Sequence, residues 1–131
     1  MNKLEVTVSK IDTLENLNIV QFDFSGINLS MMSLGLSNIN VGNKVILSVN
    51  ASHIAIAKDF EGEISLSNKL PCIIERLDKG ELLSSLRLNI EDTIITSIIT
   101  TNSVNRMNLK EKDKVLALIK ASELSIQKVI S

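Results

Sequence analysis

The side chains that could do chemistry in this chain are hydroxyls and one lysine, gathered at three places in its second half. Ser65 and Ser67 precede a predicted strand, Thr96, Ser97 and Thr100 lie in another, and Lys120-Ala121-Ser122 joins the last two strands. These groups donate hydrogen bonds through hydroxyls, backbone N–H groups or an ammonium, and none of the three clusters contains a carboxylate. Donors without acceptor charges suit an oxyanion. Serine and threonine are also common in strands and turns, so purely structural roles explain the same pattern equally well.

Catalysis finds little support in the sequence. The carboxylates are scattered over predicted turns and solvent faces, away from any histidine or nucleophile with which they could act. We expect His53 to be a solvent-facing strand residue, and Cys72, which follows Pro71, to be a small buried hydrophobe. One histidine and one cysteine fall short of a zinc site, and no GxxxxGK[ST] or GxGxxG motif is present. We therefore predict a non-enzymatic protein with no catalytic residues and no direct protein–metal ligands.

The composition favours a globular protein with an aliphatic core. The chain has 131 residues, a net charge of -1, 44% hydrophobic residues and only 2% aromatic ones. A single-stranded nucleic-acid binder would need aromatic platforms beside a basic groove, so we expect no nucleic-acid partner. No apolar run approaches the ~20 residues of a membrane span, and the first residues lack the pattern of a secretory signal. The sequence thus predicts a cytoplasmic protein without membrane contact.

The elements that must hold these groups are predicted to be strands. Leu4-Val6-Val8 and Val45-Leu47-Val49 alternate with polar residues, and the β-branched run 93–100 favours a strand covered on both faces. Short strands at roughly ten-residue spacing, separated by turn residues, predict a small all-β barrel or sandwich. One helix, of a turn or two, is expected over residues 102–107.

A comparison of the chain with itself reveals an internal repeat. The segments 2–4 and 68–70 match at an offset of 66, 29–33 and 96–100 at an offset of 67, and 49–56 and 119–126 at an offset of 70. The growth of the offset indicates that the first copy has lost about three residues opposite the predicted helix. We predict two units, at residues 1–60 and 64–131, joined by an acidic, glycine-containing segment.

The second unit resembles a known family. The stretch Ile95–Thr100, followed by Ser103-Val104, Leu109-Lys110-Glu111 and Val115–Glu123, closely resembles the signature of the molybdenum-pterin-binding family, or molbindins. Its unit is also called the Mop or TOBE domain. The segment 64–71 is similar to the Ser-Ala-Arg-Asn-Gln-Leu opening of that family. The first unit is identified as a degenerate member through the repeat, which makes the chain similar to the tandem di-Mop form.

The resemblance implies two tandem OB-like five-stranded β-barrels, each with at most one short helix. It also implies molybdate or tungstate bound between units, assembly into trimers of tandem chains, and no organic cofactor. Carried over by position, Ser65 is the opening serine, Thr100 a threonine offered by a neighbouring unit, and Lys120 with Ala121 the lysine and the following backbone amide. Ser122 is adjacent and adds a donor.

Two departures from the family pattern limit the number of complete sites. Ser67 stands where the family has an arginine, so one charge-assisted contact is missing. In the first unit, the offsets put Asn50 at the position of Lys120 and Ser33 at that of Thr100. The primary hypothesis is intracellular molybdate or tungstate storage and homeostasis. The leading alternative is a sensory or interaction module, associated with a regulator or a transporter, in which oxyanion binding is weak or lost. An OB-type nucleic-acid binder is a third reading, suggested by fold analogy only.

Overall fold

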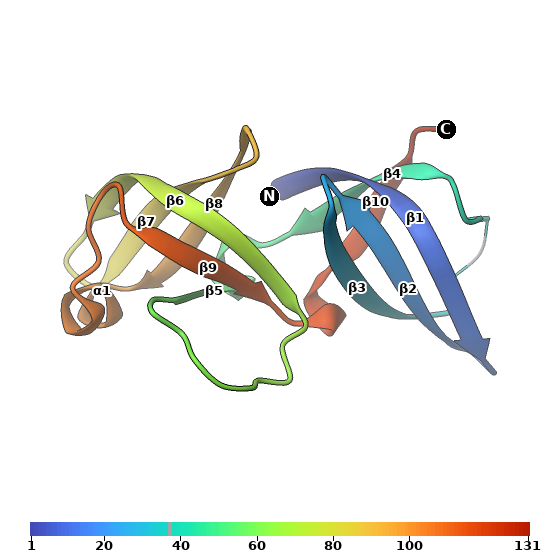
Figure 1. The fold of residues 1–131 in the computed structure, drawn as a ribbon, viewed down its shortest axis with the longest axis horizontal. Helices are drawn as coiled ribbons and strands as arrows, with labels where there is room; N and C mark the ends of the chain where they lie inside the picture. Colours follow the sequence, from blue (N-terminus) through green and yellow to red (C-terminus); the bar gives the residue numbers. More distant parts are fainter. Residues whose placement is uncertain (37) are drawn as a thin grey trace.

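The regular structure of the chain is almost entirely β-strand, as the sequence predicts (Figure 1). The computed structural model describes residues 1–36 and 38–131. The elements are, in order, β1 (Asn2–Leu14), β2 (Leu17–Phe24), β3 (Ile27–Leu34), β4 (Lys44–Val49), η1 (Ala51–His53), β5 (Ile54–Ala57), β6 (Asn68–Lys79), β7 (Leu83–Ile90), β8 (Thr93–Thr100), α1 (Thr101–Met107), β9 (Lys114–Ile119), η2 (Ala121–Glu123) and β10 (Ser125–Val129). The predicted helix over residues 102–107 is therefore confirmed as α1.

The strands form where apolar residues alternate with polar ones, because one face of each strand packs into a core. In β1 the side chains of Leu4, Val6 and Val8 are buried while the residues between them face outward. The core is mainly aliphatic, with Phe22 and Phe24 of β2 as its buried aromatic members. Two five-stranded antiparallel sheets coil around this core as OB-like barrels, which confirms the predicted fold class.

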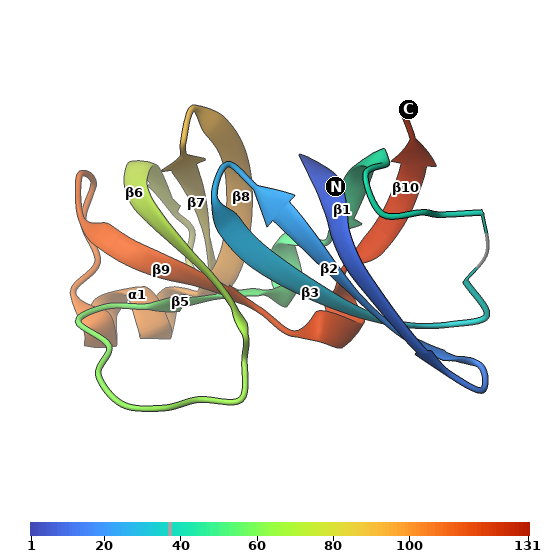
Figure 2. The ribbon, with the colours of Figure 1, turned by 45° about the vertical axis from the view of Figure 1, so that its right-hand side comes forward.

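The two barrels exchange their last strands. The first sheet has the order β10-β4-β1-β2-β3 and the second the order β5-β9-β6-β7-β8. Strand β5, which follows the first four strands in the chain, therefore pairs with β9, and β10 returns to pair with β4 (Figure 2). The predicted division at 1–60 and 64–131 follows the sequence repeat and stays a prediction; each sheet contains one strand from the other side of it.

The structure corrects the alignment of the two repeats. The first three strands of each barrel match at one offset of 66, from Asn2 to Asn68 in β1 and β6 and from Ile27 to Thr93 in β3 and β8. The predicted offset of 67 for β3 is wrong by one residue, since burial alternates in phase only when Leu29 matches Ile95. From β4 onward the offset is 70, so the first copy is shorter by four residues between β3 and β4, where the second has α1.

Two equivalent asparagines join the barrels. The amide of Asn68 accepts a hydrogen bond from Ser30 N–H at 2.7 Å and donates one to Ser30 C=O at 2.9 Å. The amide of Asn2 does the same with Thr96, at 2.8 and 2.7 Å. Strands β3 and β8 are edge strands, so each asparagine pairs backbone groups that no strand of its own sheet reaches. The reciprocal bonds hold the edge of one barrel against the first strand of the other.

Candidate functional site

Most of the predicted oxyanion ligands lie at one end of the second barrel. Asn68 at the start of β6 pairs with Ile119 at the end of β9, so Ser67 and Lys120 lie opposite each other just beyond the ladder. Lys120 caps the 3-10 helix η2, which contains Ala121 and Ser122. The side chains of Ser65, Ser67, Lys120 and Ser122 are exposed. Hydroxyls, an ammonium and the first amides of η2 are thus brought together where two antiparallel strands end.

A second cation that the motif reasoning did not single out joins this end of the barrel. Lys69 lines an open hollow of about 460 Å³ with Ser65, Glu63, Gly62 and Ile64. The alternation of side chains along β6 is a signal that could have identified Lys69. Because Asn68 is buried, its neighbours Ser67 and Lys69 both lie on the outer face of the strand. Glu63 lines the same hollow, so a carboxylate lies beside Ser65 although none of the three predicted clusters contains one.

A histidine and a glutamate from the two repeats meet beside η2. The Nδ1 atom of His53 lies 2.9 Å from Oε2 of Glu123, and each residue ends the 3-10 helix of its own repeat. The predicted exposure of His53 is confirmed, but its predicted place in a strand is wrong: it belongs to η1 and pairs with Glu123. The contact gives the Glu123 carboxylate a partner next to Ser122 and leaves Lys120 outside this pair.

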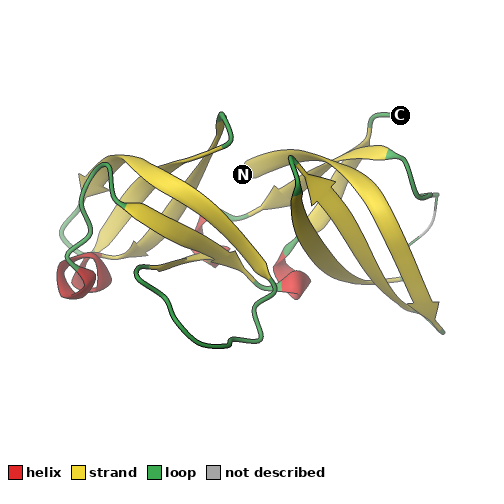
Figure 3. Ribbon diagram, viewed as in Figure 1, coloured by secondary structure: helices red, strands yellow, loops and turns green. Residues whose placement is uncertain are grey.

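Thr100 lies at the opposite end of the second barrel. It pairs with Leu83 at the end of β8 and caps α1, accepting a hydrogen bond from Ser103 N–H at 3.2 Å and donating one to Ser103 Oγ at 2.9 Å. The strand β6 runs between this end and Lys120, over roughly 35 Å if fully extended. Figure 3 shows α1 at the left edge of the molecule and the helical turn η2 near its middle. The structure does not bring Thr100 to Lys120 within one chain.

The other hydroxyls of β8 serve the fold. Ser97 is fully buried and its Oγ donates a hydrogen bond to the carbonyl of Ile54 at 2.7 Å. Thr96 binds Asn2 through its backbone. The structural explanation is therefore correct for Ser97, which helps to hold the exchanged strand β5.

The chain is similar to known proteins both in sequence and in fold. The family model of the TOBE domain matches residues 64–126. A molybdate-binding protein from Sporomusa ovata is 33% identical in sequence, with 51% of this chain covering 100% of that one at a TM-score of 0.50. The chain belongs to the Mop/TOBE family. This Mop/TOBE chain also matches the cytoplasmic molybdate-binding protein ModG, whose crystal form has molybdate bound, at a TM-score of 0.90. Sequence identity there is 23%, over 95% of this chain and 94% of that one, so this match shows the tandem fold.

Relatives of the Mop/TOBE chain also include parts of larger proteins. The molybdenum import ATP-binding protein ModC of Brucella abortus is 29% identical over 119 residues, and Brucella suis and Brucella melitensis have matches of the same extent. The match covers 90% of this chain and 32% of ModC, so the chain spans about a third of the length of the curated relatives it matches. No helix in residues 1–36 and 38–131 is long and apolar enough to cross a membrane. In the same residues, no group of three or more His, Cys, Asp or Glu side chains is arranged to hold a metal ion.

The first Mop/TOBE unit lacks the counterparts of most of these ligands. With the structural offsets, Met1 matches Ser67 and Asn50 matches Lys120. Leu34, and not the predicted Ser33, matches Thr100. Ser52 retains the hydroxyl found at Ser122. The first unit therefore offers neither the Lys120 ammonium nor the helix-capping threonine of the second.

Cys72 lies in the core of the second Mop/TOBE unit, as predicted. Its side chain is buried, Sγ lies 3.6 Å from the carbonyl oxygen of Val115, and burial raises the pKa of the thiol to about 11, partly offset by a backbone hydrogen bond. Raising the pKa by two units lowers the thiolate fraction at pH 8 by ~100-fold. We expect Ellman's reagent at pH 8 to modify Cys72 at least ~100-fold more slowly in the folded protein than in urea. Comparable rates would contradict the buried, protonated state.

Proposed function

We propose that the protein reversibly binds molybdate, or the closely similar tungstate, without chemical turnover. The observation that carries the proposal is the meeting of Ser67, Lys120 and the first amides of η2 at one exposed end of the second barrel. The family membership supports it, because the Sporomusa ovata relative is a molybdate-binding protein that aligns over its whole length. ModG, whose fold is shared over the whole chain, is also a molybdate-binding protein.

The donor set suits a tetrahedral oxyanion. Ser65, Ser67 and Ser122 supply hydroxyls, Ala121 a backbone amide, and Lys120 the charge that makes one hydrogen bond to an anion stronger than a neutral one. Lys69 adds a second positive charge beside Ser65, and this charge offsets the negative charge of Glu63. We propose that the oxyanion is the protein's ligand and that no organic cofactor takes part.

We further propose that the complete site forms between copies of the chain, in a homo-oligomer for which a trimer is favoured. Thr100 and Lys120 lie at opposite ends of the second barrel, so a threonine contact to an anion held by Lys120 has to come from another chain. A symmetric interface would also gather equivalent lysines around a dianion that a single lysine does not neutralise. The role that fits these features is intracellular molybdenum storage and homeostasis in the cytoplasm, with neither membrane nor nucleic acid as partner.

Calorimetric titration of the purified protein with molybdate, tungstate, sulfate and phosphate tests the proposal. We expect saturable binding of the first two anions and much weaker binding of the other two. Native mass spectrometry of the same samples reports the number of chains and anions per particle. The proposal fails if neither molybdate nor tungstate binds.

A sensory or interaction module is the second candidate. Ser67 in place of the family's arginine and the neutral Asn50 in the first unit favour it, since both remove positive charge from potential sites. Capture of partners from lysate, with and without molybdate, separates the two functions. A partner bound equally well in both conditions, together with undetectable molybdate binding, would favour this second candidate over storage.

A further inference from the structure

The two barrels finish the same sheet edge differently. In the first barrel β10 pairs with β4 as far as Val129 and Val45, and the chain then continues along the edge: Ile130 N–H donates to Lys44 C=O at 2.7 Å, and Lys44 N–H donates to Ser131 C=O at 3.0 Å. In the second barrel β5 pairs with β9 only as far as Ala57 and Leu116. The first edge is thus covered to the start of β4, and the second stops short of the start of β9.

The uncovered position is the backbone of Lys114, the counterpart of Lys44. Ile74 N–H donates to Asp113 C=O at 3.0 Å, so the next pair, Ile73 and Lys114, is a non-hydrogen-bonded pair whose Lys114 N–H and C=O point away from β6. In residues 1–36 and 38–131, neither of these two groups has a hydrogen-bond partner. An edge with free donors and acceptors is the kind of edge to which another strand adds.

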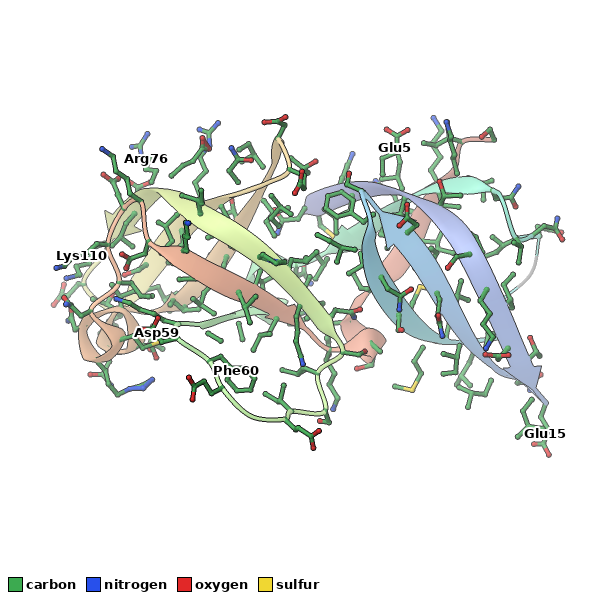
Figure 4. The ribbon with its side chains drawn as sticks, viewed as in Figure 1. Glu5, Glu15, Asp59, Phe60, Arg76 and Lys110 are labelled. Atoms are coloured by element: carbon green, nitrogen blue, oxygen red, sulfur yellow. The ribbon has the colours of Figure 1, made fainter. Side chains whose placement is uncertain are left out.

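Lys58, the first residue after β5, is anchored beside this edge through its side chain. Its ammonium donates to the carbonyl oxygens of Met107 and Asn108 at the end of α1 and lies 3.2 Å from the Asp113 carboxylate. The backbone N–H of Lys110 and then the Lys58 ammonium keep the pKa of Asp113 below its ordinary value. Asp59 has a positive φ of 52° and turns the chain outward. Figure 4 shows Asp59 and Phe60 on the loop that follows β5.

An apolar hollow lies beside the free edge. It has a volume of about 480 Å³, and its apolar walls are formed by Ala57, Phe60, Pro71, Ile73 and Leu116 among other residues. Ile73, one of the lining residues, is 43% exposed. Such a volume suits one or two aliphatic side chains, and their burial would supply the binding free energy.

The counterpart hollow in the first barrel is polar and smaller. Glu5 and Thr7 line it at the positions of Pro71 and Ile73, and its volume is about 280 Å³. The apolar lining is therefore a property of the second barrel, and it coincides with the edge that the chain leaves uncovered.

We propose that the Lys114 edge and this hollow bind an extended segment of a partner polypeptide by strand addition. The backbone of the segment would pair with Lys114, as residues 130–131 pair with Lys44 in the first barrel, and an aliphatic side chain would enter the hollow. Asp59 and Glu91 line the hollow together with Lys114, so carboxylates exceed cations there by one, which favours a segment that carries a lysine near its aliphatic residue. Residues 128–130 of this chain, Lys-Val-Ile, have that chemistry. The proposal is independent of oxyanion binding.

The test uses a fluorescein-labelled peptide with the sequence of residues 126–131, Ile-Gln-Lys-Val-Ile-Ser, titrated with the full chain by fluorescence polarisation. We expect saturable binding that Ile73→Asp weakens at least tenfold. Phe60→Ala, on a loop outside both sheets, should weaken it several-fold and guards against misfolding of the first variant. The matched control is Thr7→Asp at the equivalent position of the first barrel, which should leave peptide binding unchanged.

A peptide methylated on the nitrogen that corresponds to Ile130 tests the strand pairing itself, since it cannot donate to the Lys114 carbonyl. We expect it to bind at least tenfold more weakly than the parent peptide. Equal binding of the two peptides, or equal effects of Ile73→Asp and Thr7→Asp, would overturn the proposal. Sedimentation velocity of the Ile73→Asp and parent chains provides a further test. If Ile73→Asp alone dissociates an oligomer, a second copy covers this face and the partner segment is ruled out.

Discussion

Replacing Lys120 by alanine is expected to weaken molybdate binding by about ten- to a hundredfold. The side chain is exposed at the end of β9, next to the amides of η2, and makes no ion pair within residues 1–36 and 38–131. It is therefore free to contact an anion. Loss of one charge-assisted hydrogen bond typically costs roughly 1.5–3 kcal/mol, which corresponds to that range of affinities. Calorimetric titration of the parent and Lys120→Ala chains with molybdate measures the difference directly.

The pseudo-symmetry of the chain supplies a matched control for this measurement. Asn50 has the same place in the first repeat, at the start of η1, but carries no charge. We expect Asn50→Ala to bind molybdate within about twofold of the parent, because no charge-assisted contact is removed. Parent-like affinity of Lys120→Ala, or equal losses in both variants, would contradict the assignment of the anion to the second repeat.

The strands could be predicted because each carries its own pattern. The alternation of Leu4, Val6 and Val8 in β1 is sufficient to define a half-buried strand, whatever its partner. The pairing of the last strands could not be predicted in this way. Residues 54–57 and 125–129 occupy equivalent places in the two repeats, so the alternation of either segment is satisfied by either barrel. Only the tertiary structure decides that they are exchanged.

The part of the candidate site that could be predicted is the part in which the residues of the family motif lie at the ends of strands. Ser65, Ser67, Lys120, Ala121 and Ser122 were found from the sequence, and the Asn68–Ile119 register brings most of them to one end of the barrel. Their role as ligands remains a prediction. The first-repeat counterpart of Thr100 was misassigned because hydroxyls at neighbouring positions obscured the true phase of burial. The approach of His53 to Glu123 depends on how the repeats pack, which no local pattern encodes.

The exchange makes the two barrels depend on each other for stability. Each sheet contains a strand from the other side of the repeat boundary, and one contiguous core includes residues of both barrels. Neither repeat has a complete sheet by itself. The contacts that fix one barrel against the other are therefore expected to affect unfolding of the whole chain as one cooperative unit.

Among these contacts, Asn68 is expected to give the largest loss of stability on truncation. Its side chain is fully buried and satisfies both backbone groups of Ser30 on the edge strand β3. Asn68→Ala removes two hydrogen bonds and leaves the N–H and C=O groups of the half-buried Ser30 without these partners. An unsatisfied group costs about 1–3 kcal/mol when it is fully buried and less where water can reach it, so for the two groups of the half-buried Ser30 we expect the free energy of unfolding to fall by about 2–4 kcal/mol. Urea denaturation followed by far-UV circular dichroism measures it.

The equivalent residue Asn2 separates burial from hydrogen bonding in this prediction. It makes the same two bonds, to Thr96, but its side chain is only partly buried. Water can replace the lost amide there, so we expect Asn2→Ala to lower the free energy of unfolding by only about 1–2 kcal/mol. If Asn2→Ala is as destabilising as Asn68→Ala, the number of bonds and not their burial determines the loss. If Asn68→Ala has no effect, the asparagine bridges do not hold the barrels together, and their cohesion comes from strand exchange and the shared core.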